Sequence, residues 1–413
     1  MIKLAVISIA IITFIYRLVL NIVQYRSANN PTPHNVADVY DTETYLKWKK
    51  YSAENSVLSI ASCVVSFAAT LCLLFTNAYS AFASLFPETV FWGLFAVILL
   101  ETGIDTLFSV ISGYISTMII EEKYGFNRSS LKTFVFDIIR NTLLEFGLSL
   151  GMVCALWGIH KAFGDLLILL FAALLFVFTL AVSFLYPIFS RIGNKFTPLE
   201  DGELKDRLMS LLTDHGYKVK AIEVMDASRR TTKLNAYFTG FGKMKTIVLY
   251  DNLVNSMTPD EICAVFAHEL GHGLHKDVLK MQIMNFGNLL IMACVVWLAV
   301  REPALHAAFG FETVNYGFAY ILLGLGLGLI QPLTGLVTNA YSRKAEFRAD
   351  RQSVKEGYGE AMITALKKLA RENFAHLAPS KLNVVLGYSH PPLAQRIEAV
   401  EKALGPQDRK ASI

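Results

Sequence analysis

DLLILLFAALLFVFTLAVSFLYP, residues 165–187, is an apolar stretch whose single charged residue, Asp165, stands at its edge. An α-helix rises about 1.5 Å per residue, so about 20 apolar residues cross the roughly 30 Å hydrocarbon layer of a bilayer. The stretch therefore predicts a transmembrane helix.

Six further stretches meet the same standard. They are residues 4–23, 56–78, 90–119, 141–160, 282–300 and 316–338. Hydrophobic residues make up 54% of the chain and charged residues 17%, against about 45–50% and about 25% in soluble domains. The first stretch carries Arg17 and lacks a small-residue cleavage pattern, so we interpret it as a retained anchor. We predict a mainly α-helical, polytopic membrane protein with seven spans.

The basic residues indicate how the spans are oriented. Lys and Arg gather in the segments after the first, third, fifth and seventh spans, while the alternate connections hold few, namely Lys161 and Arg301. Alternate connections lie on the same side of a bilayer, so the basic segments share one face, which the positive-inside rule makes cytosolic. Lys3 is the single small exception.

The spans divide the chain into four parts. We expect spans one to five with their loops in residues 1–187, a soluble protease module in 188–281, spans six and seven in 282–338, and a helical C-terminal segment in 339–413. Within the module, hydrophobic patterns predict a helix at 204–215 and short strands at 218–225 and 246–250, hence a small β-sheet.

Two classes of function find no support in the composition. The net charge is only +4, and no basic block alternates with aromatic residues, so we expect no nucleic-acid partner. None of the five cysteines has CxxC spacing, which gives no sign of a disulfide framework or a cysteine metal site.

Residues 258–276 read TPDEICAVFAHELGHGLHK and contain an HExxH motif. Thr258 with Glu261 makes a capping box, and Pro259 suits the first helical position. Residues four apart share a helix face, so His268 and His272 can bind one zinc ion. A pair of partly exposed helix histidines is the plain alternative, which the cap and the apolar neighbours disfavour.

Glu269 lies about 100° round the helix from His268, where it can reach a water on the metal rather than the metal itself. Zinc lowers the pKa of such a water towards about 7, and a carboxylate can then take its proton as the water attacks a peptide carbonyl. We therefore predict Glu269 as the general base.

A catalytic zinc needs a third protein ligand and one open position. Glu346, in SRKAEFRAD at residues 342–350, is the best candidate. Asp350 follows on the same helical face, where it could orient a ligand histidine. Alone, this stretch would be taken for a charged, solvated helix face. His275, His160 and His215 are expected to be structural or solvated.

The ordered set of motifs resembles the type I CAAX prenyl endopeptidases, seven-span zinc proteases of the gluzincin type. The resemblance extends from about Asp41 to the end of the C-terminal segment. Its motifs are EEKYGFN at 121–127, FTPLE at 196–200, NAYFTGF at 235–241, HELGH, the Ser342–Asp350 stretch and SHPP at 389–392.

The resemblance implies further roles. Asn235, Ala236, Tyr237 and Phe238 would form an edge strand that binds the substrate backbone. His390 and Arg396 would contact the transition state and the substrate. The seven helices would enclose a water-filled chamber. The intramembrane charged residues would either line it or lie at span ends; they are Arg17, Glu101, Asp105 and Glu145.

The sequence thus predicts a metalloendopeptidase with one zinc ion per chain, acting on membrane-associated or prenylated peptide substrates. A broad membrane quality-control protease and a non-catalytic chamber for lipids or lipidated peptides remain alternatives. The active site should face the cytosol. A tail without a dilysine or KDEL-type signal favours a bacterial inner membrane, with the endoplasmic reticulum as the eukaryotic alternative. The sequence does not predict an oligomeric state.

Overall fold

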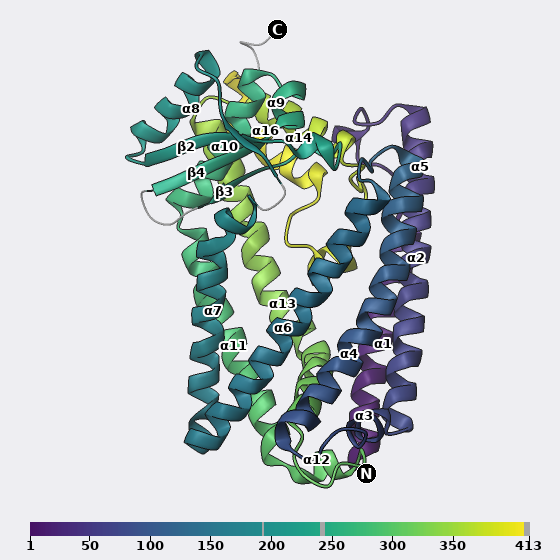
Figure 1. The fold of residues 1–413 in the computed structure, drawn as a ribbon. Helices are drawn as coiled ribbons and strands as arrows, with labels where there is room; N and C mark the ends of the chain where they lie inside the picture. Colours follow the sequence, from purple (N-terminus) through teal and green to yellow (C-terminus); the bar gives the residue numbers. More distant parts are fainter. Residues whose placement is uncertain (192–193, 240–243, 409–413) are drawn as a thin grey trace.

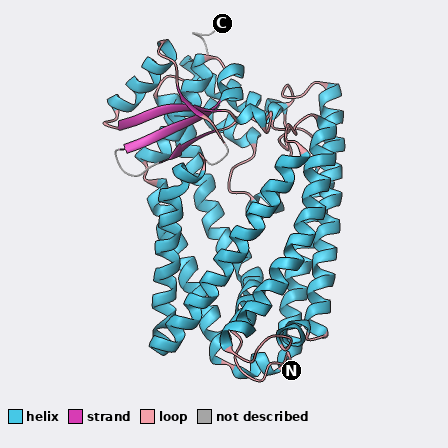
Figure 2. Cartoon of the chain, in the orientation of Figure 1, coloured by secondary structure: helices cyan, strands magenta, loops and turns pink. Residues whose placement is uncertain are grey.

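The structure is a computed structural model and describes residues 1–191, 194–239 and 244–408. Long helices form a tall bundle, and a small sheet with its covering helices lies at one end of it (Figures 1 and 2). The first helix begins at Ile2 and the last ends at Asp408, and these two points lie at opposite ends of the molecule.

The long helices overlap the predicted spans. They are α1 Ile2–Ser27, α2 Thr42–Phe75, α4 Val90–Gly113, α6 Leu131–Phe163, α7 Leu167–Phe189, α11 Asp277–Arg301 and α13 Tyr316–Lys355. By length and apolar content, six stretches of the described residues could cross a membrane. One of them, residues 131–183, contains both α6 and α7, which the 3-10 turn η3 Gly164–Leu166 separates.

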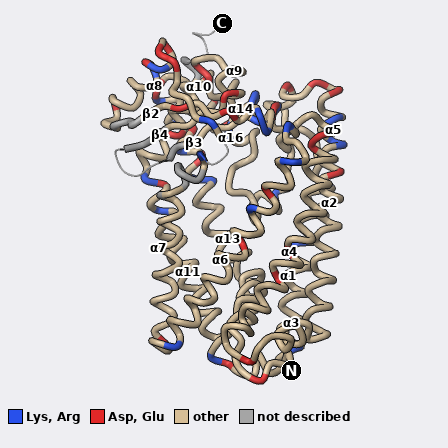
Figure 3. The backbone as a smooth tube through the Cα atoms, viewed as in Figure 1, with Lys and Arg blue, Asp and Glu red and all other residues tan. Residues whose placement is uncertain are grey.

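Apolar side chains cover the outside of these helices. Leu143, Ile283 and Val337, for example, are 66%, 64% and 65% exposed in the isolated chain. Water would not tolerate so much uncovered apolar surface, whereas the hydrocarbon of a bilayer covers it. Charged residues concentrate near the two ends of the bundle (Figure 3), as expected of a multi-pass membrane protein.

The helices pack most closely at the end away from the sheet. Their shared core there includes Ile7, Leu74, Val97, Phe171, Val296 and Phe318. Gly317 lets α13 approach α4, because a Cβ at this position would lie 2.7 Å from the carbonyl oxygen of Leu94. The short helices α3 Ala78–Ala83 and α12 Pro303–Ala307 close this end.

Several helices extend beyond the predicted spans. Asp41 caps α2 by accepting a hydrogen bond from the backbone N–H of Thr44, so this helix begins well before residue 56. The third span continues through a π-helical segment, η2 Tyr114–Glu121, into α5 Glu122–Tyr124. α13 continues past residue 338 to Lys355. The apolar pattern marks the part of a helix within lipid, not its full length.

The sheet has the order β1-β2-β4-β3. Its strands are β1 Phe196–Pro198, β2 Lys218–Met225, β3 Ala236–Thr239 and β4 Met244–Tyr250; β2 and β4 are parallel, and the other pairs are antiparallel. The predicted helix is α8 Glu203–Asp214. The predicted edge strand is β3, and it lies at the edge of the sheet. The turn that the glycines at 240 and 242 predict after this strand lies outside the described residues.

Short helices precede and follow the last two spans. They are η4 Ala227–Arg229, α9 Asp251–Ser256, α10 Pro259–Leu274, α14 Gly359–Glu372, α15 Lys381–Gly387 and α16 Leu393–Asp408. Of these, α9 and α10 contact the sheet, α14 packs on α10, α16 packs on α14, and α15 packs on α13 and α1. Ala365 of α14 belongs to the same apolar core as Leu253 and Phe266. The turn η1 His34–Val36, before α2, packs on α16 through Val36 and Ile397. The module and the C-terminal segment therefore fold together.

Candidate active site

Helix α10 begins at the predicted capping box. The hydroxyl of Thr258 accepts a hydrogen bond from the Glu261 N–H, and the Glu261 carboxylate accepts one from the Thr258 N–H. The start of the helix is thereby fixed, and His268 and His272 lie in its interior on one face. Their rings are 4.8 Å apart, centroid to centroid.

Helix α13 brings Glu346 against these histidines. Oε2 of Glu346 lies 3.6 Å from Nε2 of His268, and Oε1 lies 3.4 Å from Nε2 of His272. Gly271 makes this crossing possible, because a Cβ there would lie 2.9 Å from the Cα of Ala349. Sequence reasoning chose these three residues as ligands, and the fold brings them together.

The three side chains fit a metal ion. One ligand atom from each lies within 4.8 Å of the other two. Tetrahedral zinc with bonds of about 2.0–2.1 Å places its ligand atoms about 3.3–3.4 Å apart, close to the distances above. Oε2 of Glu346 is buried and has no hydrogen-bond partner among the described residues. A cation would satisfy this oxygen, so the donor set suits a catalytic zinc with one open position.

Asp350 orients His268. Its Oδ1 lies 2.9 Å from Nδ1 of His268, which leaves the Nε2 atom of that ring for the metal. Arg396 of α16 in turn binds Asp350 in a bidentate manner, at 2.9 and 2.6 Å. Burial tends to lower the pKa of Arg396, but the Asp350 and Glu346 carboxylates raise it, so its charge is retained.

Asp277 orients His272, a role that sequence reasoning missed. Its Oδ2 lies 3.1 Å from Nδ1 of His272, and the carboxylate is 4% exposed. Tyr341 and Arg348 of α13 donate to its other oxygen at 2.7 and 2.6 Å. An acidic residue five positions after the second motif histidine, at the start of the next helix, is the signal that could have indicated this.

The surrounding carboxylates favour positive charge on the ligands. Burial tends to lower the pKa of His272, but the hydrogen bonds and charges of Glu346 and Asp277, with the charge of Glu269, raise it to about 9. At neutral pH the ring would therefore carry a second proton and a positive charge. A divalent cation bound to His272 would compensate the negative charge of these carboxylates in the same way. Proton and metal therefore compete for His272.

A cavity of about 160 Å³ opens on these groups. The predicted site residues that line it are Asn235, Ala236, His268, Glu269, Glu346, His390 and Arg396. Ala236 begins β3, and the side chain of Asn235 accepts a hydrogen bond from the Ala236 N–H. The cavity thus places an edge strand beside the candidate metal ligands.

The remaining residues of the predicted strand lie differently. The Tyr237 ring faces Tyr250, 6.5 Å away, and Tyr237 does not line the cavity. Successive side chains of a strand point to opposite faces, so Ala236 and Tyr237 cannot share one. Phe238 pairs with Ile247 through its backbone; its side chain is outside the description.

His390 reaches the site from the segment before α16. Its Nε2 lies 3.3 Å from Oε1 of Glu346, and the side chain is 64% exposed, so one edge of the ring is open to a substrate. The histidines expected to be structural lie elsewhere: His160 pairs with Tyr316 and His215 with Glu356. His275 caps the end of α10.

Comparisons with known proteins cover nearly the whole chain. Residues 198–404 match peptidase family M48, and residues 21–191 match the CAAX prenyl protease N-terminal family, described as five membrane helices. The CAAX prenyl protease 1 homolog of Arabidopsis thaliana is 30% identical over 422 residues, covering 96% of each chain. CAAX prenyl protease 1 of Saccharomyces cerevisiae is 30% identical and covers 97% of this chain and 95% of its own length. The crystal structure of S. mikatae Ste24p matches with a TM-score of 0.90 and 28% identity, covering 97% of this chain and 99% of that one.

Proposed function

Because the chain belongs to peptidase family M48, among relatives named CAAX prenyl proteases, we propose that it cleaves C-terminally prenylated, CAAX-type peptides with one zinc ion held by His268, His272 and Glu346. Family membership makes the chain a membrane metalloendopeptidase, so the non-catalytic chamber considered from sequence is set aside. M48 peptidases in general depend on zinc.

One observation carries the proposal: the cavity lined by His268, His390, Glu269 and Glu346 is bordered by β3, the edge strand of the sheet. An edge strand offers free N–H and C=O groups, so it can bind an extended peptide through its backbone. A substrate bound along Asn235 to Phe238 would pass the candidate ligands.

When bound, zinc would polarise the scissile carbonyl and acidify a water molecule. Glu269, which faces the same cavity, would take a proton from the attacking water and pass it to the leaving nitrogen as the C–N bond breaks. His390 would donate a hydrogen bond to the carbonyl oxygen as its negative charge develops. Asp350 and Asp277 would hold the histidine rings, and Arg396 would hold Asp350 while facing Glu346 at 3.4 Å.

We further propose that the site faces the cytosol. The support is the basic character of the connections at the sheet end of the bundle, including Lys123, Arg140 and Arg191.

Replacing Glu269 by Gln tests the mechanism. The change removes the base and keeps the size, so turnover of a farnesylated CAAX peptide should fall at least about 10²-fold while metal content stays near one per chain. Glu360→Gln, at an exposed position of α14, is the matched control and should retain activity. Near wild-type turnover in Glu269→Gln would remove Glu269 from this role. Equal cleavage of an unprenylated peptide would favour the quality-control alternative.

A further inference from the structure

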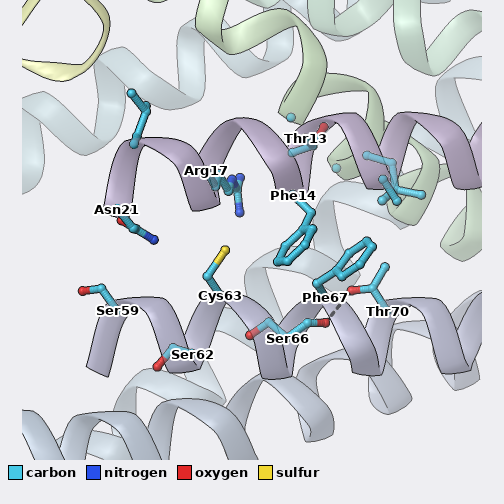
Figure 4. Close-up of a pocket in the computed structure, with 15 residues that line it drawn as sticks. Thr13, Phe14, Arg17, Asn21, Ser59, Ser62, Cys63, Ser66, Phe67 and Thr70 are labelled. Carbon is cyan, nitrogen blue, oxygen red and sulfur yellow. Dashed lines mark hydrogen bonds between the residues drawn. The ribbon is translucent and has the colours of Figure 1, made fainter. Parts of the chain in front are cut away.

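A second, larger cavity lies between α1, α2 and α13, away from the active site. Its volume is about 570 Å³, within the range of small-molecule sites. It is lined by Ala10, Thr13, Phe14, Arg17, Leu20, Asn21, Ser59, Ser62, Cys63, Ser66, Phe67, Thr70, Gly324, Leu325 and Gly328 (Figure 4). None of these residues lines the active-site cavity.

Arg17 is the single charged residue in this lining, which contains no acidic residue. It stands 10 residues before the end of α1, so it lies about 15 Å from that end, inside the predicted span. Within the described parts of the chain, Arg17 has no hydrogen bond or ion pair, and its side chain is exposed to the open space of the cavity. An arginine in a spanning helix that faces a cavity without an acidic partner is a candidate for binding an anion.

Polar groups without partners surround Arg17. Ser59, Ser62 and Ser66 on α2 and Asn21 on α1 make no side-chain hydrogen bond to any described residue. The hydroxyl of Thr13 is buried and likewise lacks a hydrogen-bond partner among described groups. Figure 4 shows Arg17, Asn21 and Cys63 directed into the space between the two helices. Those of these groups that lie nearest Arg17 can donate to the oxygens of an anion beside it.

The other end of the cavity is apolar. The rings of Phe14 and Phe67 stack there at 3.9 Å, from opposite helices (Figure 4). The neighbouring residues Ile15 and Val64 are 52% and 43% exposed and add apolar surface beside it. A ligand that fits must therefore carry an anionic group and an apolar chain.

We propose that this cavity binds the phosphate of an anionic phospholipid from the bilayer, with Arg17 as the charge partner and its acyl chains along the apolar surface of α1 and α2. Arginine suits this task because its guanidinium can donate two hydrogen bonds to one phosphate. A lipid source is favoured over a soluble phosphate because the cavity lies between helices that could span a membrane, beside exposed apolar side chains.

Cys63 provides a direct readout, since it lines the cavity beside Arg17. The full chain would carry Cys63 alone, with serine in place of Cys72, Cys154, Cys263 and Cys294. In detergent, phosphatidylglycerol should slow alkylation of Cys63 by N-ethylmaleimide in a saturable manner. Phosphatidylcholine with the same acyl chains should need at least about 10-fold higher concentration, and inorganic phosphate at millimolar concentration should not protect.

Arg17→Gln should weaken this protection at least about 10-fold, whereas Arg17→Lys should retain most of it. Arg26→Gln is the matched control, because it removes an exposed charge from the same helix outside the cavity and should change protection less than about 2-fold. Should Arg17→Gln fail to fold, a variant with Ser62→Leu and Ser66→Leu keeps the charge and should lose protection.

Three outcomes would overturn the proposal. They are equal protection by phosphatidylcholine, protection by inorganic phosphate alone, and unchanged protection in Arg17→Gln. Peptidase activity plays no part in this readout, so its result is independent of the proposed function.

Discussion

Each of the two candidate ligand histidines is held by a carboxylate from a different helix. Asp350 of α13 holds His268, and Asp277 at the start of α11 holds His272. A carboxylate on Nδ1 fixes the tautomer and leaves Nε2 for a metal. The two contacts together orient both rings before a metal arrives, which lowers the entropic cost of binding it.

Asp277→Asn should therefore weaken zinc binding about 10- to 100-fold, because the substituted side chain no longer stabilises the positive charge that His272 shares with the metal. Competition with a chromophoric chelator would measure the affinity. Asp201→Asn, at an exposed carboxylate of the module surface, is the control and should bind zinc as the wild type does. If Asp277→Asn bound zinc with wild-type affinity, the contact between Asp277 and His272 would have no role in zinc binding.

His390→Ala should lower kcat about 10²-fold with zinc content unchanged, because a donor to the developing oxyanion acts mainly in the transition state. Steady-state kinetics and metal analysis on the same preparation would separate the two effects. His275→Ala replaces a neighbouring histidine that does not line the cavity and should keep its kcat. A change in KM alone would argue against the role.

Sequence reasoning placed Arg396 near the site but missed its pairing with Asp350. The two residues are 46 apart in sequence, and their contact depends on how α16 packs against α13. Motif spacing within one helix, as for His268 and His272, is set by helical geometry alone. Contacts between helices require tertiary packing, which also explains why Asp277 was missed.

At the scale of elements, the crossing of α10 and α13 assembles the metal ligands. Gly271 stands at the closest approach of the two helices, with Ala349 and Gln352 opposite. Ser353 strengthens the crossing by donating a buried hydrogen bond to the carbonyl of Ala264 at 2.8 Å. The glycine in HELGH is therefore required by helix packing, which is independent of the metal-binding role of the motif.

Gly271→Ala should destabilise the protein by about 1–3 kcal/mol, because the new methyl group meets backbone atoms of α13 that cannot rotate away. The melting temperature and the zinc content should both fall. Gly287→Ala is the control: it is also inside a helix, but a Cβ there meets nothing within 4 Å, so stability should hold or rise slightly. If Gly271→Ala were as stable as the wild type, α10 and α13 could move apart to accommodate the methyl group with no loss of stability, which would contradict this prediction.

A half-buried histidine joins the first two long helices to the C-terminal segment. His376 shares a hydrogen bond with Ser27 at 2.8 Å, and its ring lies 5.0 Å from that of Trp48. Burial lowers the pKa of His376 from its ordinary value to about 4. The folded protein therefore keeps this ring neutral under conditions where the unfolded chain protonates it.

Stability should consequently fall as pH drops from about 6.5 towards 4. Above about 6.5 the ring is neutral in both states and the pH has no effect; below it, only the unfolded state binds the proton. Melting temperatures of the wild type and His376→Gln, measured between pH 8 and 5, would test this. The variant should lose less stability on acidification, and parallel curves would contradict the assignment.

At the scale of the whole molecule, apolar runs predicted where the chain crosses the membrane but not where its helices end. Lipid constrains the side chains of residues 316–338, while the next 17 residues of α13 follow the polar pattern of a soluble helix. This continuity has a consequence for the site. A single continuous helix links the membrane bundle to Glu346 and Asp350, so helix geometry sets the distance of the site from the spanning part of α13.

Orientation across the bilayer gives the last prediction. The basic connections lie at the sheet end, so Asp201 and Lys402, both exposed, should face the cytosol, and Glu88 at the opposite end should face outward. In a background with all five native cysteines replaced, single cysteines at these positions would be labelled with a membrane-impermeant maleimide in intact cells and in inverted vesicles. Asp201→Cys and Lys402→Cys should react only in inverted vesicles, and Glu88→Cys only in intact cells. The two module-side positions lie in parts of the chain separated by two spans, so both must share a side if α11 and α13 each cross once. Labelling of Asp201→Cys and Lys402→Cys from opposite sides would refute the span count, and labelling of both from outside would invert the topology.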